Sequence, residues 1–237
     1  MTGDASAAGI VDRSFEVDDM SLSVRPGILD IAAYVPGDHS LPGDGPVHRM
    51  ASNEGALGAS PQALEAYRAL AGELHRYPDG ASKALRTALG KELGIEPEQI
   101  VCGAGSDDVL QLLVRAYAGP GDEVLYSQHG FLVYPIAAKA VGATPVAAPE
   151  KDLRTDVDGL LKAVSPRTRI CFVANPNNPT GSYVTGTELK RLRAGLPDNV
   201  LLVVDAAYAE YVDLPEYESG LEMVRNSDNV VMTRTFS

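Results

Sequence analysis

The sequence is poor in cysteine, in basic residues and in long apolar runs. Its two cysteines, Cys102 and Cys171, lie in or beside apolar segments, so we expect buried free thiols in a reducing compartment. Lysine and arginine number 20 against 32 acidic residues, and the net charge of -12 argues against a nucleic-acid partner. No apolar run approaches the roughly 18 residues of a membrane span, and the N-terminus lacks a signal-peptide pattern. We therefore expect a cytoplasmic protein with no membrane partner.

What the sequence does contain is typical of a globular α/β protein. Apolar residues make up 45% and charged residues 22% of its 237 residues, enough for one large domain with a sizeable core and some extra chain. Residues 1–50 are rich in Gly, Pro, Asp and Ser, which predicts an extended N-terminal arm. We assign residues 51–237 to the large domain.

Strand and helix patterns alternate through the large domain. Short apolar runs predict strands near residues 99–102, 123–126, 144–147, 169–174, 200–205 and 229–233. Helical patterns lie near 61–71, 82–93, 106–118, 130–142, 156–163 and 186–195. This alternation predicts an α/β fold with a mostly parallel central sheet covered by helices. In such sheets, ligands bind beyond the carboxyl ends of the strands.

One of these strand ends carries an acid. The apolar run Val200 to Val204 leads directly into Asp205, and Tyr208 follows three residues later. An ionised carboxylate beside apolar packing is costly unless a cation or several donors meet it. Asp205 therefore predicts a binding partner at this edge of the sheet.

Three further segments follow predicted strands. In "GAGSDD" (103–108), Ser106 or Asp107 would cap a helix whose first amides could hold a phosphate, although a plain strand-to-helix turn has the same pattern. "NPNNPTG" (175–181) is a stiff loop with three Asn side chains. "RTFS" (234–237) offers the hydroxyls of Thr235 and Ser237. "RYPDG" (76–80) alone would be an ordinary surface turn.

Taken together, these segments resemble a known family. "ASNE" (51–54), "RYPDG", "GAGSDD", "NPNNPTG", "VVDAAYAEY" (203–211) and "RTFS" occur in the order and spacing of the fold-type I pyridoxal-phosphate aminotransferases, in particular the histidinol-phosphate aminotransferase branch. The resemblance begins near residue 25. It implies the large domain of a pyridoxal 5'-phosphate (PLP)-dependent transferase, with the small C-terminal domain beyond the end of the chain.

The resemblance also implies roles for individual residues. Asp205 would face the pyridine nitrogen of the cofactor and keep it protonated. Asn178 and Tyr208 would hydrogen-bond the 3-oxygen of the ring. Phe131 would stack on the ring, although an aromatic residue at a helix start is also common in protein cores. The cofactor phosphate would bind the group formed by Gly105, Ser106, Asp107, Thr235 and Ser237.

By the same resemblance, Tyr77 would reach across a dimer interface to the partner's cofactor phosphate. The protein would then be a homodimer with shared active sites. The arm "VRPGILDIAAYVPG" (24–37) places Tyr34 in the substrate pocket, and Asn53 lies where that branch approaches its substrate. The substrates would be a small-molecule amino donor and a 2-oxo acid.

The sequence departs from the family pattern at two points. The family usually has Glu where this chain has Ala206; because the cofactor contacts are made by the flanking Asp and Tyr, we expect catalysis to survive. The family continues "RTFS" with the lysine that forms the Schiff base, and no lysine of this sequence matches that position. We expect this lysine directly after Ser237, already bonded to the cofactor.

We favour transamination between histidinol phosphate and 2-oxoglutarate, in histidine biosynthesis. Aromatic amino acid aminotransferases share the same arm and are the main alternative. A non-catalytic PLP-binding homologue is a lesser one. A PLP-binding transcription regulator would need a DNA-binding module that neither the N-terminus nor the acidic charge supports.

Overall fold

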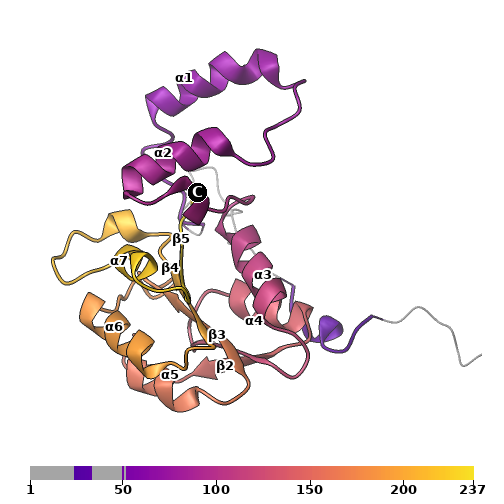
Figure 1. Cartoon of the computed structure of the whole chain (residues 1–237), viewed down its shortest axis with the longest axis vertical. Helices are drawn as coiled ribbons and strands as arrows, with labels where there is room; N and C mark the ends of the chain where they lie inside the picture. The colour runs from indigo at the N-terminus through magenta and orange to yellow at the C-terminus, as the bar shows by residue number, and fades with distance from the viewer. Residues whose placement is uncertain (1–23, 34–49, 51) are drawn as a thin grey trace, which may run out of the picture.

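The computed structural model describes residues 24–33, 50 and 52–237. Within these residues, five strands form one parallel sheet in the order β2-β1-β3-β4-β5. The strands are β1 (Glu123–Ser127), β2 (Thr144–Ala148), β3 (Thr168–Ala174), β4 (Leu201–Asp205) and β5 (Val230–Thr233). The prediction of a mostly parallel sheet covered by helices is confirmed (Figure 1).

Two helical layers cover the sheet because its strands are apolar on both faces. On one face, α3 (Ser106–Tyr117) and α4 (Val133–Ala140) pack on alternate residues of β3 such as Ile170 and Phe172. On the other face, α5 (Val157–Ala163), α6 (Gly186–Gly195) and α7 (Leu221–Arg225) pack on residues such as Cys171 and Val173. The alternation along β3 thus divides the core into two clusters, and Figure 1 shows the sheet between the two layers.

Two helices stand apart from these layers. Figure 1 shows α1 (Pro61–Leu70) and α2 (Lys83–Leu93) beyond the carboxyl end of β5. Ser60 precedes α1 and caps it, because its hydroxyl accepts a hydrogen bond from the Ala63 amide, but α1 buries no residue. None of the helices in the described part of the chain is long and apolar enough to cross a membrane.

The predicted strand at residues 99–102 is wrong. A short 3-10 turn occupies Pro97–Gln99, and the extended backbone that follows pairs with no strand among the described residues. Val101 is 75% exposed. The apolar run correctly indicates extended backbone, but a strand also needs a neighbour whose backbone groups are free to pair with it.

Smaller differences concern element ends and the N-terminal arm. α4 begins at Val133 rather than near residue 130, and the short helix α7 was not predicted. Of the predicted arm, residues 24–33 contain the 3-10 turn Ile28–Asp30, which lies near α4 through a hydrogen bond from Lys139 to the Asp30 carbonyl. Most of the remaining arm lies outside the described residues, so the proposed domain division stays a prediction.

Both cysteines are free, as expected. Cys171 lies in β3 and is fully buried, which raises the pKa of its thiol to about 12. Cys102 is only half-buried, so the expectation of two buried thiols holds for one of them.

Candidate active site

The carboxyl ends of β3, β4 and β5 and the start of α3 surround a pocket of about 150 Å³. The parallel order of these strands explains the arrangement, because all of them end at the same edge of the sheet. The sequence-predicted residues that line this pocket are Asn53, Ser106, Asp107, Phe131, Asn178, Asp205, Tyr208, Thr235 and Ser237.

Asp205 is the last residue of β4 and is 5% exposed. Its Oδ2 accepts a hydrogen bond from the Tyr134 hydroxyl at 2.8 Å, and its Oδ1 accepts one from the Thr233 hydroxyl at 2.9 Å. Burial raises the pKa of Asp205 and the charge of Asp107 adds to this, while the bonds from Tyr134, Thr233 and the Ala207 amide act in the opposite direction. No ion pair among the described residues includes Asp205. The acid is therefore held by neutral donors and has no cationic protein partner there.

Sequence reasoning missed both hydroxyl donors. Thr233 stands opposite Asp205 in the register of β4 and β5. If β4 and β5 had been predicted to be neighbours, this contact could have been expected, because paired parallel strands place the residues at their carboxyl ends side by side. Tyr134 offers no such signal, since its approach to Asp205 depends on how α4 packs against the sheet.

The start of α3 lies beside this acid. Gly105 occupies the cap position before the helix, with φ 83°, and it makes no side-chain hydrogen bond to the helix. The expectation that Ser106 or Asp107 is the cap is wrong, because both lie inside the first turn. Among the described residues, the cap position thus gives the first amides of α3 no side-chain acceptor, and the positive end of the helix dipole is a favourable place for an anion.

Two hydroxyls face the same region. Thr235 and Ser237 lie 2.8 Å apart between their Oγ atoms. Together with Ser106 and Asp107, they also line an adjoining pocket of about 480 Å³, and Gly105 lies in the wall of that second pocket rather than the first. The group predicted to bind phosphate therefore lies where the two pockets meet.

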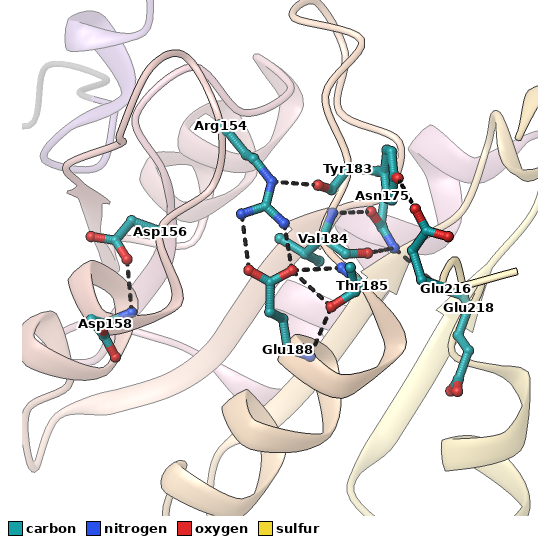
Figure 2. Close-up of polar contacts among 10 residues, drawn as sticks. All are labelled: Arg154, Asp156, Asp158, Asn175, Tyr183, Val184, Thr185, Glu188, Glu216 and Glu218. Atoms are coloured by element: carbon teal, nitrogen blue, oxygen red, sulfur yellow. Dashed lines mark hydrogen bonds and ion pairs between the residues drawn. The ribbon is translucent and has the colours of Figure 1, made fainter. Parts of the chain in front are cut away.

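The loop that carries Asn178 is fixed by Asn175, which is fully buried. The Asn175 side chain donates to the carbonyls of Val184 (3.2 Å) and Glu218 (3.1 Å), and its Oδ1 accepts from the Val184 amide (2.9 Å; Figure 2). Its backbone N–H donates to the carbonyl of Asp205 at 2.9 Å. The Asn175 side chain thus joins the start of the loop to Val184, and the Asn175 backbone ties the loop to the strand that carries the acid.

An ion pair supports the same loop from outside. Figure 2 shows the Arg154 guanidinium between the Tyr183 carbonyl, 2.8 Å from Nε, and the Glu188 carboxylate. Glu188 and Thr185 also form a capping box at the start of α6. The hydrogen bonds from Arg154, with those from Thr185, lower the pKa of Glu188 to about 2 despite its partial burial.

Asn177 joins two walls of the pocket. It is buried, and its Nδ2 donates to the His129 carbonyl at 3.1 Å and to the Thr180 hydroxyl at 2.8 Å. His129 lies two residues before Phe131, and its ring contacts the Glu150 carboxylate at 2.8 Å. The loop with Asn178 is therefore bonded to the segment with Phe131.

Asn53 and Tyr208 lie in contact. The Asn53 Nδ2 donates to the Tyr208 hydroxyl at 2.9 Å. Asn53 has φ 54°, a left-handed conformation that Asn tolerates better than most residues. This bond brings a segment that precedes α1 to the end of β4.

Two further predicted site residues are Tyr77, which the structure places outside both pockets, and Tyr34, which it does not describe. Tyr77 is 96% exposed in the connection between α1 and α2 and does not line either pocket. Tyr34 lies outside the described residues.

The chain is similar to known aminotransferases. The sequence pattern of the family described as "Aminotransferase class I and II" matches residues 46–237. Histidinol-phosphate aminotransferase from Rhodospirillum centenum is 66% identical over 213 residues, and its counterpart from Paramagnetospirillum magneticum is 61% identical over 213 residues. These matches cover 90% of this chain and 59% of each relative, so the chain spans about three-fifths of the length of these relatives.

Solved structures give the same picture. A crystal structure of histidinol-phosphate aminotransferase from Sinorhizobium meliloti, in complex with pyridoxal-5'-phosphate, superposes with a TM-score of 0.74 at 33% identity. The superposition covers 78% of this chain and 50% of the Sinorhizobium meliloti chain.

We predict that Asn175→Ala destabilises the protein by about 1–3 kcal/mol, because it leaves the buried Val184 amide without its acceptor. Urea unfolding measures this difference. Asn226→Ala is the matched control: Asn226 is exposed and bonds only within its own helix end, to Glu222, so its loss should cost less than about 0.5 kcal/mol. Equal effects of the two substitutions would contradict the role given to Asn175.

We also predict a pH dependence from Glu188. Its pKa is about 2 in the folded protein against an ordinary value of 4.5, so its contribution to stability is fully present above pH 4.5 and is lost as the pH falls toward 2. Glu188→Gln should therefore lower the free energy of unfolding at pH 7, and the difference from the unchanged protein should shrink in acid. Urea unfolding at several pH values measures it. A difference that stays constant down to pH 3 would refute the assignment.

Proposed function

Since the chain belongs to the class I and II aminotransferases, we propose that the protein transfers an amino group between histidinol phosphate and 2-oxoglutarate, with pyridoxal phosphate as its cofactor. One observation carries the proposal: Asp205 is buried at the edge of the pocket without a cationic protein partner among the described residues. The names of the two relatives reported above support the choice of substrate.

The pocket residues fit this cofactor. Among the described residues, the buried Asp205 carboxylate is held by hydroxyls and an amide, and it is well placed to bind a cationic heterocycle, since a positive ring nitrogen offsets the cost of burying the charge. The uncapped start of α3 and the hydroxyls of Thr235 and Ser237 offer donors to a phosphate. Both features lie in the walls of the same pocket.

The contacts proposed for each residue rest on these placements together with the family resemblance. The amides of Gly105, Ser106 and Asp107, with the two hydroxyls, would hold the phosphate. Phe131 would pack against the ring face. Asn178 and Tyr208 would donate hydrogen bonds to the phenolic oxygen of the ring, which would fix the tilt of the ring.

When bound, pyridoxal phosphate supplies a ring that accepts electrons from the Cα of the amino substrate. Asp205 contributes by electrostatics: its negative charge stabilises a proton on the ring nitrogen. Asn53 would approach the substrate from beside Tyr208, and Tyr34, outside the described residues, would complete that side. We expect the lysine that bonds the cofactor to follow Ser237.

We further propose a cytoplasmic homodimer with shared active sites. Tyr77 is exposed and outside the pocket, which supports a role in the site of a partner subunit. α1 exposes Leu64, Tyr67 and Leu70, apolar side chains suited to an interface. The free cysteines are typical of a reducing compartment.

We expect Asp205→Ala in the full-length protein to lower kcat by about two orders of magnitude or more while pyridoxal phosphate still binds, because the substitution removes electrostatic stabilisation and leaves the phosphate contacts. Steady-state kinetics and cofactor absorbance measure the two effects. Asp213→Ala, an exposed acid outside the pocket, is the control and should keep normal turnover. Near-normal turnover of Asp205→Ala would defeat the proposal.

Substrate choice is tested by kcat/KM on histidinol phosphate and on phenylalanine, each with 2-oxoglutarate. We expect histidinol phosphate to be preferred by at least about tenfold, a difference of roughly 1.4 kcal/mol in transition-state binding. A preference for phenylalanine would assign the protein to the aromatic aminotransferases instead. Absence of turnover with both, together with cofactor binding, would indicate a non-catalytic homologue.

A further inference from the structure

We propose that Tyr134 is a positioning residue of this site: its hydroxyl holds the Asp205 carboxylate in its charged form and fixed orientation, and its ring holds Phe131 in the pocket wall. The inference rests on the proposed function for its catalytic meaning, whereas the hydrogen bond from Tyr134 to Asp205 is a feature of the fold itself.

The hydrogen bonds to Asp205 leave its carboxylate little freedom. Tyr134, on the first turn of α4, donates to Oδ2, and Thr233, on β5, donates to Oδ1. The two donors come from different elements, one from a helix that packs on the sheet and one from the strand paired with β4. Rotation of the carboxyl group would break both bonds at once.

The ring of Tyr134 is itself locked. It is 1% exposed and stacks on Phe172 with ring centroids 4.5 Å apart and planes 1° from parallel. Its edge contacts Phe131 at 6.0 Å between centroids, in a T-shaped pair. Gly130 allows the tight turn before Phe131, because a Cβ there would lie 2.9 Å from the Ser127 carbonyl. One side chain therefore contacts both the acid and the aromatic residue of the pocket.

The Tyr134 hydroxyl opposes the effects that favour a neutral Asp205. Burial strongly raises the pKa of Tyr134, and the negative charge of Asp205 adds to this, so the phenol stays a donor. Burial and the charge of Asp107 raise the pKa of Asp205, whereas Tyr134, Thr233 and the Ala207 amide lower it. Loss of the phenol removes one of the stabilising donors and favours a neutral Asp205, which cannot hold a positive ring nitrogen.

The test compares Tyr134→Phe with Tyr126→Phe in the full-length protein. Tyr126 belongs to the same aromatic cluster, with its ring 6.3 Å from that of Tyr134, but it is not a hydrogen-bond partner of Asp205. Infrared difference spectroscopy on the cofactor-free protein follows protonation of the Asp205 carboxyl, assigned with Asp205→Asn. We expect protonation at higher pH in Tyr134→Phe and no change in Tyr126→Phe.

Kinetics on the cofactor-loaded protein give the second measurement. An ionised Asp205 is needed for turnover, so activity falls on the acid side, and in Tyr134→Phe this acid limb of kcat should move to higher pH. At neutral pH, kcat should fall about tenfold with less than about threefold change in KM, since the substrate contacts are left in place. A merely structural role would lower the amount of folded protein without moving the pH profile.

A second variant keeps the inference testable if Tyr134→Phe does not fold. Replacing Tyr134 by 3-fluorotyrosine keeps the ring and makes the phenol a stronger donor, so the Asp205 carboxyl should titrate at lower pH. Unchanged titration in the variant that folds would overturn the inference, even if transamination is found. A shifted titration in a protein that does not bind pyridoxal phosphate would support the contact and refute the proposed function.

Discussion

The site is organised around one buried negative charge. Asp205 sits at the end of a strand that is apolar on both faces, where an unpaired carboxylate is costly. Its surroundings meet this cost only in part, with hydroxyls from α4 and β5, and the cationic heterocycle of the proposed cofactor would supply the remainder. The parallel sheet makes the arrangement possible, because it delivers the acid, the Asn178 loop and the hydroxyls after β5 to one edge.

Most of the fold could be predicted from local patterns. Runs such as Ile170 to Ala174 are apolar throughout, which is typical of strands buried on both faces, and they alternate with amphipathic helices. The strand expected at residues 99–102 failed because strand pairing depends on a neighbour, which no local pattern specifies. The prediction that Ser106 or Asp107 caps α3 was also wrong. The cap position is Gly105, with φ 83°, and glycine has no side chain that could accept a hydrogen bond.

The pocket residues were predictable to the extent that they follow strands directly. Asp205 was found because a polar residue at the end of an apolar run stands out, whereas Asn178 and Thr235 were singled out through the resemblance of their segments to the aminotransferase family. The residues that hold them were not. In the sequence, Asn175 resembles the other Asn residues of its loop, yet its side chain is fully buried and hydrogen-bonded. Tyr134 donates to Asp205 although the two residues are 71 positions apart in the sequence. Their roles depend on packing between elements.

Asn53 differs from these supports in one respect. It contacts Tyr208 from a segment outside the helices and strands, whereas Asp205, Thr233 and Asn175 are fixed by the sheet and its loops. Exchanges around Asn53 would leave the strand register undisturbed. Under the proposed roles, the substrate contact of Asn53 and the cofactor contact of Asp205 would thus lie in parts of the chain with separate mechanical support, so that one could change while the other stays in place.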